Sequence, residues 1–356
     1  MTEAAIFAGA GASLAVNSNQ YPTTTEFMSR LPDAIKQQPL FRECERYLSS
    51  RQESPDIEKL LWLVNEAKAF AENSPSKSFV HHLIHGQALK TIVGMPDDAL
   101  KHFVPKMSDL TTKANSLIHN INREVYNQYG SKPDREALRT NWEPLLEIFS
   151  PTEFDTLDIF TTNYDRVLEA AIRYLSPGID VGHVDDVDRI LNLDRWKLGY
   201  RVTERGLLTK LHGSVDWIRG GGDDIFISDP SFKSDHGRHV ILYPGFKGMP
   251  TTSPFNLFHQ YFKNKLKTAS VVLLVGFAFR DDYINEILRE STNREALVII
   301  LNPGDLQDIP YAIGKYIHIK ALFDTSGIEK VRNALRTSGS QVQGDRNLRL
   351  EESASE

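Results

Sequence analysis

The stretch Phe7-Ala8-Gly9-Ala10-Gly11-Ala12-Ser13 decides how this chain folds, because a glycine turn directly follows an apolar run at residues 4–8. A short apolar run of this kind is typical of a buried strand. Glycines after such a strand let the backbone turn tightly and approach a diphosphate, which the N–H groups of the following turn can bind. The stretch therefore predicts a dinucleotide-binding turn at Gly9, Ala10, Gly11, Ala12 and Ser13. A glycine turn that binds nothing is the alternative.

The match to the fingerprint of the dehydrogenases is incomplete. Its third glycine position holds Leu14, and residues 17–25 form an irregular polar stretch. A second strand with a ribose-binding acid is expected about 20 residues after the turn in a dehydrogenase. Hydride transfer is therefore disfavoured, whereas dinucleotide binding is not.

Apolar runs and helical patterns alternate along the rest of the chain. Six runs predict buried strands, at residues 4–8, 157–161, 207–211, 271–276, 297–301 and 316–320. Helical patterns follow at residues 165–175, 254–267, 281–291 and 327–336. Near-continuous apolar strands that alternate with helices indicate a parallel sheet covered on both faces. We expect an α/β protein with a Rossmann-like parallel six-stranded sheet.

About 150 residues separate the first two predicted strands, and this gap has helical periodicity at residues 54–70, 108–126 and 142–149. Apolar side chains that recur at three- and four-residue spacing form the buried face of a helix. We therefore expect a large helical insertion at residues 31–150. Residues 1–30 and 151–336 form the sheet domain, and residues 337–356 form a polar tail.

Composition limits the class of protein. The 356 residues carry a net charge of −6, and Cys44 is the single cysteine. A negative charge argues against nucleic acid as the main partner, and a lone cysteine fits a reducing compartment. The apolar runs are too short to span a bilayer, and the first residues lack the pattern of a signal peptide. We expect a cytoplasmic protein with neither membrane nor direct nucleic-acid contacts.

Polar residues follow several of the predicted strands. Asn163 and Asp165 stand in the segment Thr-Thr-Asn-Tyr-Asp at residues 161–165, and His212 follows the strand at residues 207–211. Open α/β sheets bind ligands at the carboxyl ends of their strands, and histidine suits acid–base chemistry near neutral pH. Asn163 or Asp165 could instead cap the next helix, and a lone histidine is often structural.

Two further strand ends carry weaker signals. Gly276 and Phe277 lie where the strand at residues 271–276 meets a glycine turn, and Asp281-Asp282 follows this turn. Asn302 follows the strand at residues 297–301. Each signal is weak alone, but all of them occur at the edge where such a sheet binds its ligand.

The order of these motifs resembles that of the sirtuin family. There, a Gly-Ala-Gly-x-Ser loop, a Thr-Gln-Asn-Ile-Asp segment, a His-Gly pair, a Gly-Thr-Ser turn and an Ile-Asn pair follow one another. The matching positions here are residues 9–13, 161–165, 212–213, 276–278 and 301–302. Sirtuin deacylases also carry four zinc-binding cysteines soon after the histidine, and a chain with one cysteine cannot form that site. Residues 217–248 would replace the zinc module with loops. The pattern is similar to that of bacterial SIR2-like NADases of anti-phage defence.

The resemblance implies NAD as the substrate and no metal. It implies that Asn163 holds the ribose or the attacking water, that Asp165 binds the carboxamide side, and that His212 is the general base. Residues 9–13 would hold the diphosphate, and Gly276, Phe277 and Asn302 the adenosine side. A protein deacylase or ADP-ribosyltransferase and a nucleotide sensor without turnover remain as alternatives. The pair His81 and His85, in a run that also includes His82, has the spacing of metal ligands but lacks the acid of a metalloprotease motif.

The resemblance also implies self-assembly and a second protein. Proteins of this kind form homo-oligomers and act beside a HerA-type ring ATPase or a short Argonaute. We favour the ATPase, because no basic patch suggests contact with a nucleic-acid guide.

Overall fold

The computed structural model describes residues 2–52, 56–73, 97–175, 178–183, 190–199, 203–220, 224–227, 238–242, 250–305, 313 and 316–338. The chain divides into two units. Residues 1–21, 128–242 and 247–356 form the first unit, and residues 22–127 with 243–246 form the second. The first unit contains every strand of the described chain, and the second is helical.

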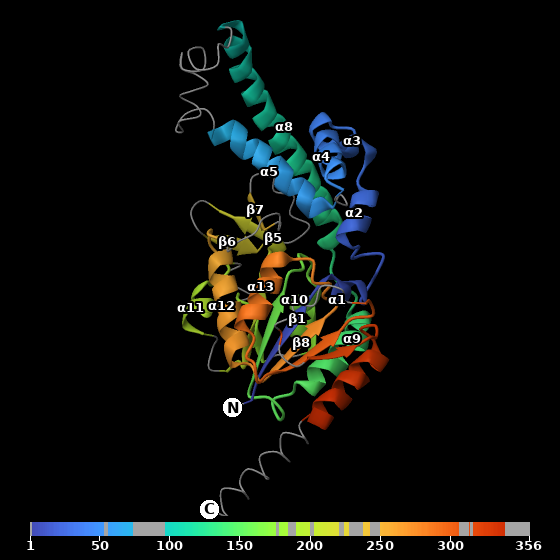
Figure 1. Ribbon diagram of the computed structural model, residues 1–356. Helices are drawn as coiled ribbons and strands as arrows, with labels where there is room; N and C mark the ends of the chain where they lie inside the picture. The colour runs from blue at the N-terminus through green and yellow to red at the C-terminus, as the bar shows by residue number, and fades with distance from the viewer. Residues whose placement is uncertain are drawn as a thin grey trace, which may run out of the picture. The chain divides into compact units, whose positions relative to one another are not determined.

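A parallel sheet of seven strands is the centre of the first unit (Figure 1). In order across the sheet these are β10 (Tyr316–Ile319), β9 (Leu297–Leu301), β8 (Val271–Val275), β1 (Glu3–Ala8), β2 (Thr156–Thr161), β4 (Gly206–Lys210) and β3 (Ile179–Asp180). Without β3, the strands follow the order 3-2-1-4-5-6 that defines a Rossmann sheet. The α/β class is thus confirmed, but the count of six strands was wrong. The seventh strand, β3, has two residues, too few for a periodic pattern.

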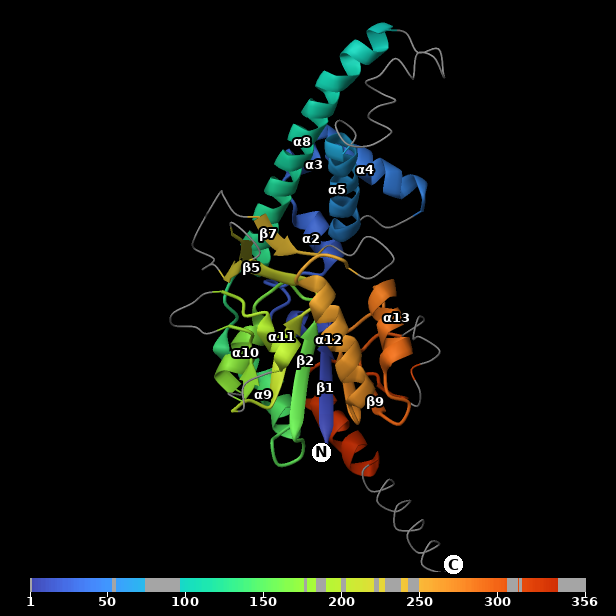
Figure 2. The same cartoon turned by 90° about the vertical axis from the view of Figure 1, so that its left-hand side faces the viewer.

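Direct pairing connects segments that are far apart in the sequence. Glu3 lies beside Thr156 and Ala8 beside Thr161, so β1 and β2 run in register along their whole length, as Figure 2 shows. On its other side, β1 pairs with β8, with Ala8 beside Val275. The carboxyl ends of β1, β2 and β8 therefore lie at one edge of the sheet.

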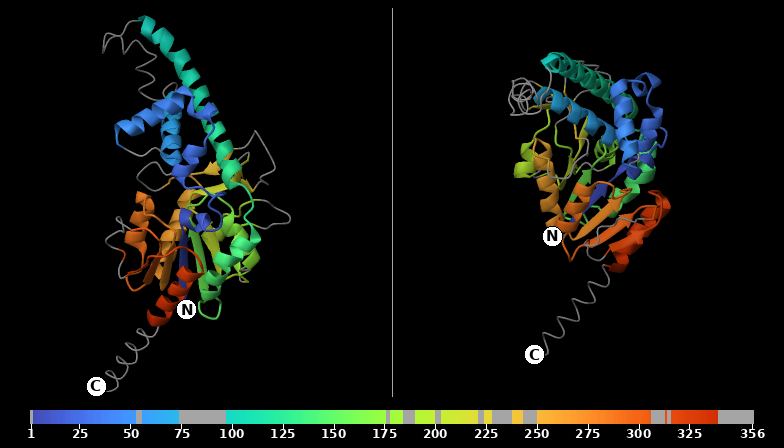
Figure 3. Two further views of the ribbon diagram at one scale, coloured as in Figure 1. Left: turned by 90° about the vertical axis from the view of Figure 1, so that its right-hand side faces the viewer. Right: turned by 45° about the horizontal axis from the view of Figure 1, so that its top comes forward.

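Helices cover both faces of the sheet, as the apolar strands require (Figures 1 and 3). Apolar residues of α11 (Asp194–Leu198), α12 (Phe255–Thr268) and α13 (Asp282–Ser291) pack in one core with Phe7, Phe160 and Leu274. The other face is covered by α9 (Arg135–Ile148), α10 (Val167–Leu175) and a helix at residues 325–338. The short helix α1 (Ala10–Leu14) follows β1 directly.

A second, smaller sheet follows β4 in the chain. It is antiparallel, with the order β6 (Ile225–Ile227), β5 (Gly213–Arg219) and β7 (Arg238–Ile241). The sequence predicted loops at residues 217–248, and the described part of this region forms strands instead. These strands are three to seven residues long, and the glycines at residues 220–222 between them indicated a loop.

The second unit is built from helices that pack through apolar faces. They are α2 (Thr24–Arg30), α3 (Asp33–Lys36), α4 (Pro39–Ser50), α5 (Ile57–Asn73) and most of α8 (Asp97–Tyr129). Leu60, Leu61 and Val64 of α5 are completely buried, at the spacing that the sequence predicted for a helix. The predicted insertion at residues 31–150 also included α9, which belongs to the first unit. Among the described helices, none combines the length and apolar character that a bilayer crossing requires.

The close contact of β4 with β2 yields a test of the sheet. A Cβ atom on Gly206 would lie 1.6 Å from the carbonyl oxygen of Leu157, so the two strands would have to separate. We expect Gly206→Ala to lower the free energy of unfolding by about 2 kcal/mol or more, as overpacking does in a rigid core. Denaturant unfolding measures this loss. Gly178→Ala is the control, because its nearest neighbour would be the Arg205 side chain at 3.7 Å. Equal stability of the two variants would contradict the described pairing.

Candidate functional site

Three glycines meet where the order of the sheet reverses, between β1 and β8. A Cβ atom on Gly9 would lie 2.7 Å from the Gly276 carbonyl oxygen, and one on Gly11 would lie 2.8 Å from the Gly276 Cα. Gly276 has a φ of +61°, which favours glycine. The N–H groups of Gly9 and Gly11 donate to Val275 O and Gly276 O at 2.9 and 3.0 Å. The Ala12 N–H also donates, to Gly9 O at 3.0 Å. The glycines thus let two turns touch, and three of the N–H groups that we expected to hold a diphosphate already bond within the protein.

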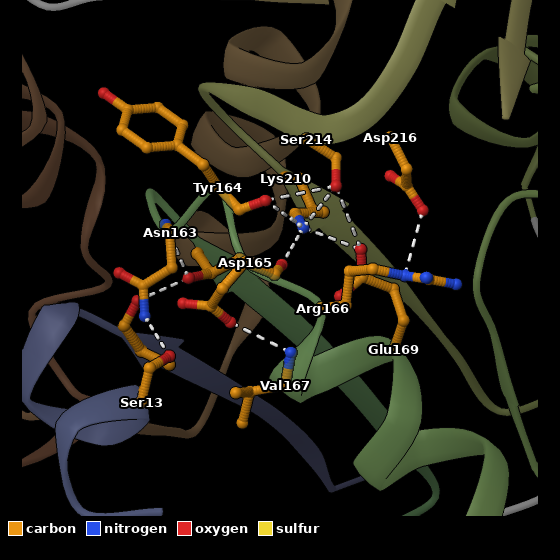
Figure 4. A network of polar contacts seen from close by, with 12 residues as sticks. Ser13, Asn163, Tyr164, Asp165, Arg166, Val167, Glu169, Lys210, Ser214 and Asp216 are labelled. Carbon is orange, nitrogen blue, oxygen red and sulfur yellow. Dashed lines mark hydrogen bonds and ion pairs between the residues drawn. The ribbon is translucent and has the colours of Figure 1, made fainter. Parts of the chain in front are cut away.

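Asn163 joins the end of β2 to the glycine turn after β1. Its side chain is buried, and its Nδ2 donates to Gly9 O and to Ser13 Oγ, both at 2.9 Å (Figure 4). Its backbone N–H donates to Thr161 Oγ1, whose hydroxyl in turn donates to Ala8 O at 2.7 Å. The structure therefore brings together Asn163 and Ser13, which are 150 positions apart in the sequence.

Asp165 completes this cluster and also caps a helix. Its Oδ1 accepts a hydrogen bond from the Val167 N–H at the first residue of α10, at 2.9 Å. The Ser13 hydroxyl bonds to the same carboxylate. Burial raises the pKa of Asp165 above its usual range, while the Lys210 ammonium and the Ser13 hydrogen bond oppose this rise. Asn163, Ser13 and Asp165 thus form one hydrogen-bonded series, in which the amide donates to the hydroxyl and the hydroxyl to the carboxylate.

A buried lysine lies beneath this cluster. Lys210, at the end of β4, is 2% exposed, and its Nζ lies 2.6 Å from Glu169 Oε1 and 2.8 Å from Ser214 Oγ. It also donates to the carbonyl oxygen of Asp165 (Figure 4). Lys210 therefore fixes the turn that carries Asn163 and Asp165. The sequence contained this lysine two residues before His212, but its apolar neighbours gave no sign of an ion pair.

His212 forms a separate pair at the next strand end. Its side chain is 4% exposed, and its Nε2 lies 3.2 Å from Asp281 Oδ2. Gly213 after it has a φ of +82°, and a Cβ atom there would lie 2.0 Å from Val240 O, so only glycine fits. The ring of Tyr164, the residue between Asn163 and Asp165 in the sequence, has its centre 6.3 Å from that of His212.

Asp281 was noted in the sequence only as part of a turn, yet it is the acid that faces His212. Its Oδ1 accepts hydrogen bonds from the N–H groups of Tyr283 and Ile284, both at 3.0 Å, and so caps α13. Burial alone would raise the pKa of Asp281. The hydrogen bond and charge of His212 and the Ile284 N–H outweigh burial and lower this pKa. A helix-capping pattern at Asp281 could have been found in the sequence, but its contact with His212 could not.

Gly276, Phe277 and Asn302 lie at the ends of β8 and β9. The Phe277 ring is buried against Phe7, with ring centres 4.8 Å apart. Asn302 Nδ2 donates to Phe277 O at 2.8 Å, and its Oδ1 accepts from Gly304 N at 2.9 Å. Asn302 therefore links the turns after β8 and β9, and the residues of the site extend along the edge of the sheet from β4 to β9.

Within the described ranges, no three side chains of His, Cys, Asp or Glu are grouped to hold an ion. The histidines at positions 81, 82 and 85 lie outside the described residues.

Comparison with known proteins finds similarity over part of the chain. Residues 158–316 match the family model of the SIR2-like domain. A Sir2 homologue in complex with NAD is 14% identical, with 94% of this chain and 90% of that chain covered and a TM-score of 0.41. A Sir2 homologue mutant with ADP-ribose is 13% identical, with 95% and 93% covered and a TM-score of 0.41. No curated protein matches the sequence.

The ion pair beneath the site yields a test of stability. In Lys210→Met, Glu169 would stay largely buried without its cation, and unfolding should become easier by about 3–5 kcal/mol. Lys197→Met is the matched control, because Lys197 and Asp194 form an exposed pair that contributes less than about 1 kcal/mol. Thermal or denaturant unfolding measures both. Similar stabilities of these two variants would contradict the structural role of Lys210.

The buried side chain of His259, beside His212, should make the stability of the protein depend on pH. Burial lowers the pKa of His259 to about 4 from its usual 6.5, against the opposing hydrogen bond to Phe255 O. The unfolded chain therefore binds the extra proton first, and stability falls as the pH decreases from 6.5 to 4, by about 3 kcal/mol. His259→Phe should remove this part of the pH dependence. The control His119→Phe, at an exposed position of α8, should retain it. Parallel stability curves of wild type and His259→Phe would disprove the burial of a neutral ring.

Proposed function

We propose that the protein is an NAD hydrolase that cleaves the bond between nicotinamide and ribose and releases nicotinamide and ADP-ribose. The observation that carries this proposal is the meeting of Asn163 with Gly9 and Ser13 at the point where the strand order reverses. Open α/β sheets bind dinucleotides at this point. The SIR2-like match of residues 158–316, which contain Asn163 and His212, supports NAD as the ligand.

The proposed reaction requires little acid catalysis. The electron pair of the C–N bond leaves with nicotinamide and neutralises its positive ring, so the ribose becomes oxocarbenium-like. Water then adds its oxygen to the same carbon and loses one proton. The protein must hold the ribose, orient the carboxamide and position the water, because the rate enhancement comes from the fixed geometry of the reacting groups.

The buried polar groups suit these tasks. Asn163 would hold the ribose or the water, and its amide is already oriented by Gly9 and Ser13. Asp165 would bind the carboxamide side, and the Val167 N–H at the start of α10 already orients its carboxylate. His212 would accept the proton from water or from a ribose hydroxyl. The turn at Gly9–Ser13 would hold the diphosphate, and Gly276, Phe277 and Asn302 would hold the adenosine side.

A deacylase or ADP-ribosyltransferase would break the same bond and differ only in the acceptor. Nicotinamide release without any added protein or peptide therefore separates hydrolysis from these alternatives. A sensor without turnover would release none.

We also propose that the enzyme works as a homo-oligomer whose activity a second protein controls, with a HerA-type ATPase favoured over a short Argonaute. An unrestrained NAD hydrolase would exhaust the NAD of its own cell. We propose that this depletion of NAD serves anti-phage defence. Light scattering should show an assembly at micromolar concentration. A monomer with full turnover alone would contradict this part of the proposal.

Chromatography of the products tests the main proposal. Purified protein incubated with NAD should release equal amounts of nicotinamide and ADP-ribose, and chelators should leave the rate unchanged. Asn163→Ala and His212→Ala should each lower kcat by about 10²–10⁴-fold, the usual contribution of a positioned catalytic group. His119→Ala, at an exposed histidine, is the control. Undiminished NAD cleavage in either site variant, with a normal unfolding curve, would overturn the assigned roles.

A further inference from the structure

We propose that Asp281 is a positioning residue: it holds His212 with the proton on Nε2 and leaves Nδ1 as the basic nitrogen. This inference rests on the proposed function, in which His212 is the base. It adds the carboxylate that holds His212 and the ring nitrogen that accepts the proton. Neither follows from the sequence, where Asp281 and His212 are 69 positions apart.

His212 and Asp281 form a close, buried pair. Nε2 of His212 lies 3.2 Å from Asp281 Oδ2, and the two side chains are only 4% and 13% exposed. A carboxylate can only accept, so the nitrogen that faces it carries the proton. In the described part of the chain, Nδ1 of His212 is buried without a hydrogen-bond partner, and Asp281 Oδ2 is likewise buried with only its 3.2 Å contact to His212 Nε2. A buried unpaired nitrogen is costly unless a ligand or water uses it.

Asp281 is itself held by the start of α13. Its Oδ1 accepts from the backbone N–H groups of Tyr283 and Ile284 at the start of α13. This leaves Oδ2 for His212 and fixes the plane of the carboxylate. Since the pKa of Asp281 is lowered, its charge persists near neutral pH. The start of α13 thus places the negative charge of Asp281 beside Nε2 of His212.

His259 is a neighbouring titratable side chain whose ring lies near His212. The ring of His259 lies 6.4 Å from that of His212, but its Nδ1 bonds to Phe255 O at 2.8 Å, and its pKa of about 4 keeps it neutral. It therefore neither repels a protonated His212 nor competes for Asp281 as a cation. A buried Asp that fixes the tautomer of a catalytic histidine has a precedent in the serine proteases.

The substitution Asp281→Asn tests this assignment without removing the helix cap, because asparagine caps helices equally well. The single oxygen of asparagine is required by the N–H groups of Tyr283 and Ile284. Its NH₂ group must then face His212 and donate to Nε2, which forces the proton onto Nδ1. We expect kcat for NAD cleavage to fall by about 10²–10⁴-fold, as for the corresponding change in a serine protease, with the KM for NAD nearly unchanged. Asp282→Asn, at the next and exposed position of the same helix, is the control and should leave kcat unchanged.

The protonation of the ring can be measured without activity. In protein labelled with ¹⁵N-histidine, the His212 signals are identified by their loss in His212→Gln. We expect an Nε2-protonated ring in the wild type and an Nδ1-protonated ring in Asp281→Asn. An unchanged tautomer, or full kcat in Asp281→Asn, would overturn the proposal. If the wild type cleaved no NAD, the proposed function would fail, and the ring signals alone would decide the pairing of Asp281 with His212.

Discussion

The turn after β1 and the turn after β8 touch through Gly9, Gly11 and Gly276, with no side chain between them. This contact fixes the two central strand ends at the point where the strand order reverses, and all the polar groups of the site are placed relative to it. Asn163 reaches the carbonyl of Gly9, and Asn302 reaches the turn that begins at Gly276. A side chain at any of the three glycines would separate the turns and displace both asparagines.

Two buried pairs of side chains extend this framework on either side, one an ion pair and the other a contact between a histidine and a carboxylate. Lys210 and Glu169 support the turn of Asn163 from below, and Asp281 supports His212 from the start of α13. Buried charges are costly to strip of water, so such pairs seldom add much stability in themselves. Here these pairs serve to position side chains, because each one fixes a polar group at the edge of the sheet. Sites that act by orientation depend on such supporting contacts.

The sequence predicted the α/β class, most of the strands and the ends at which Asn163 and His212 lie, because apolar runs and glycine turns are local signals. It missed β3, which is too short for periodicity, and the small sheet of β5, β6 and β7. It also missed Lys210 and Asp281 as members of the site. Their partners are 41 and 69 positions away in the chain, and only the paired strands bring them together.

We propose that NAD binds at the carboxyl edge of the sheet, around the three glycines. Hydrogen exchange in the His212→Ala variant, measured with and without NAD, tests it most directly, because this variant should bind the dinucleotide without consuming it. We expect slower amide exchange at residues 9–17 and 161–167 when NAD is present. Protection confined to other parts of the chain, with these two segments unchanged, would contradict it.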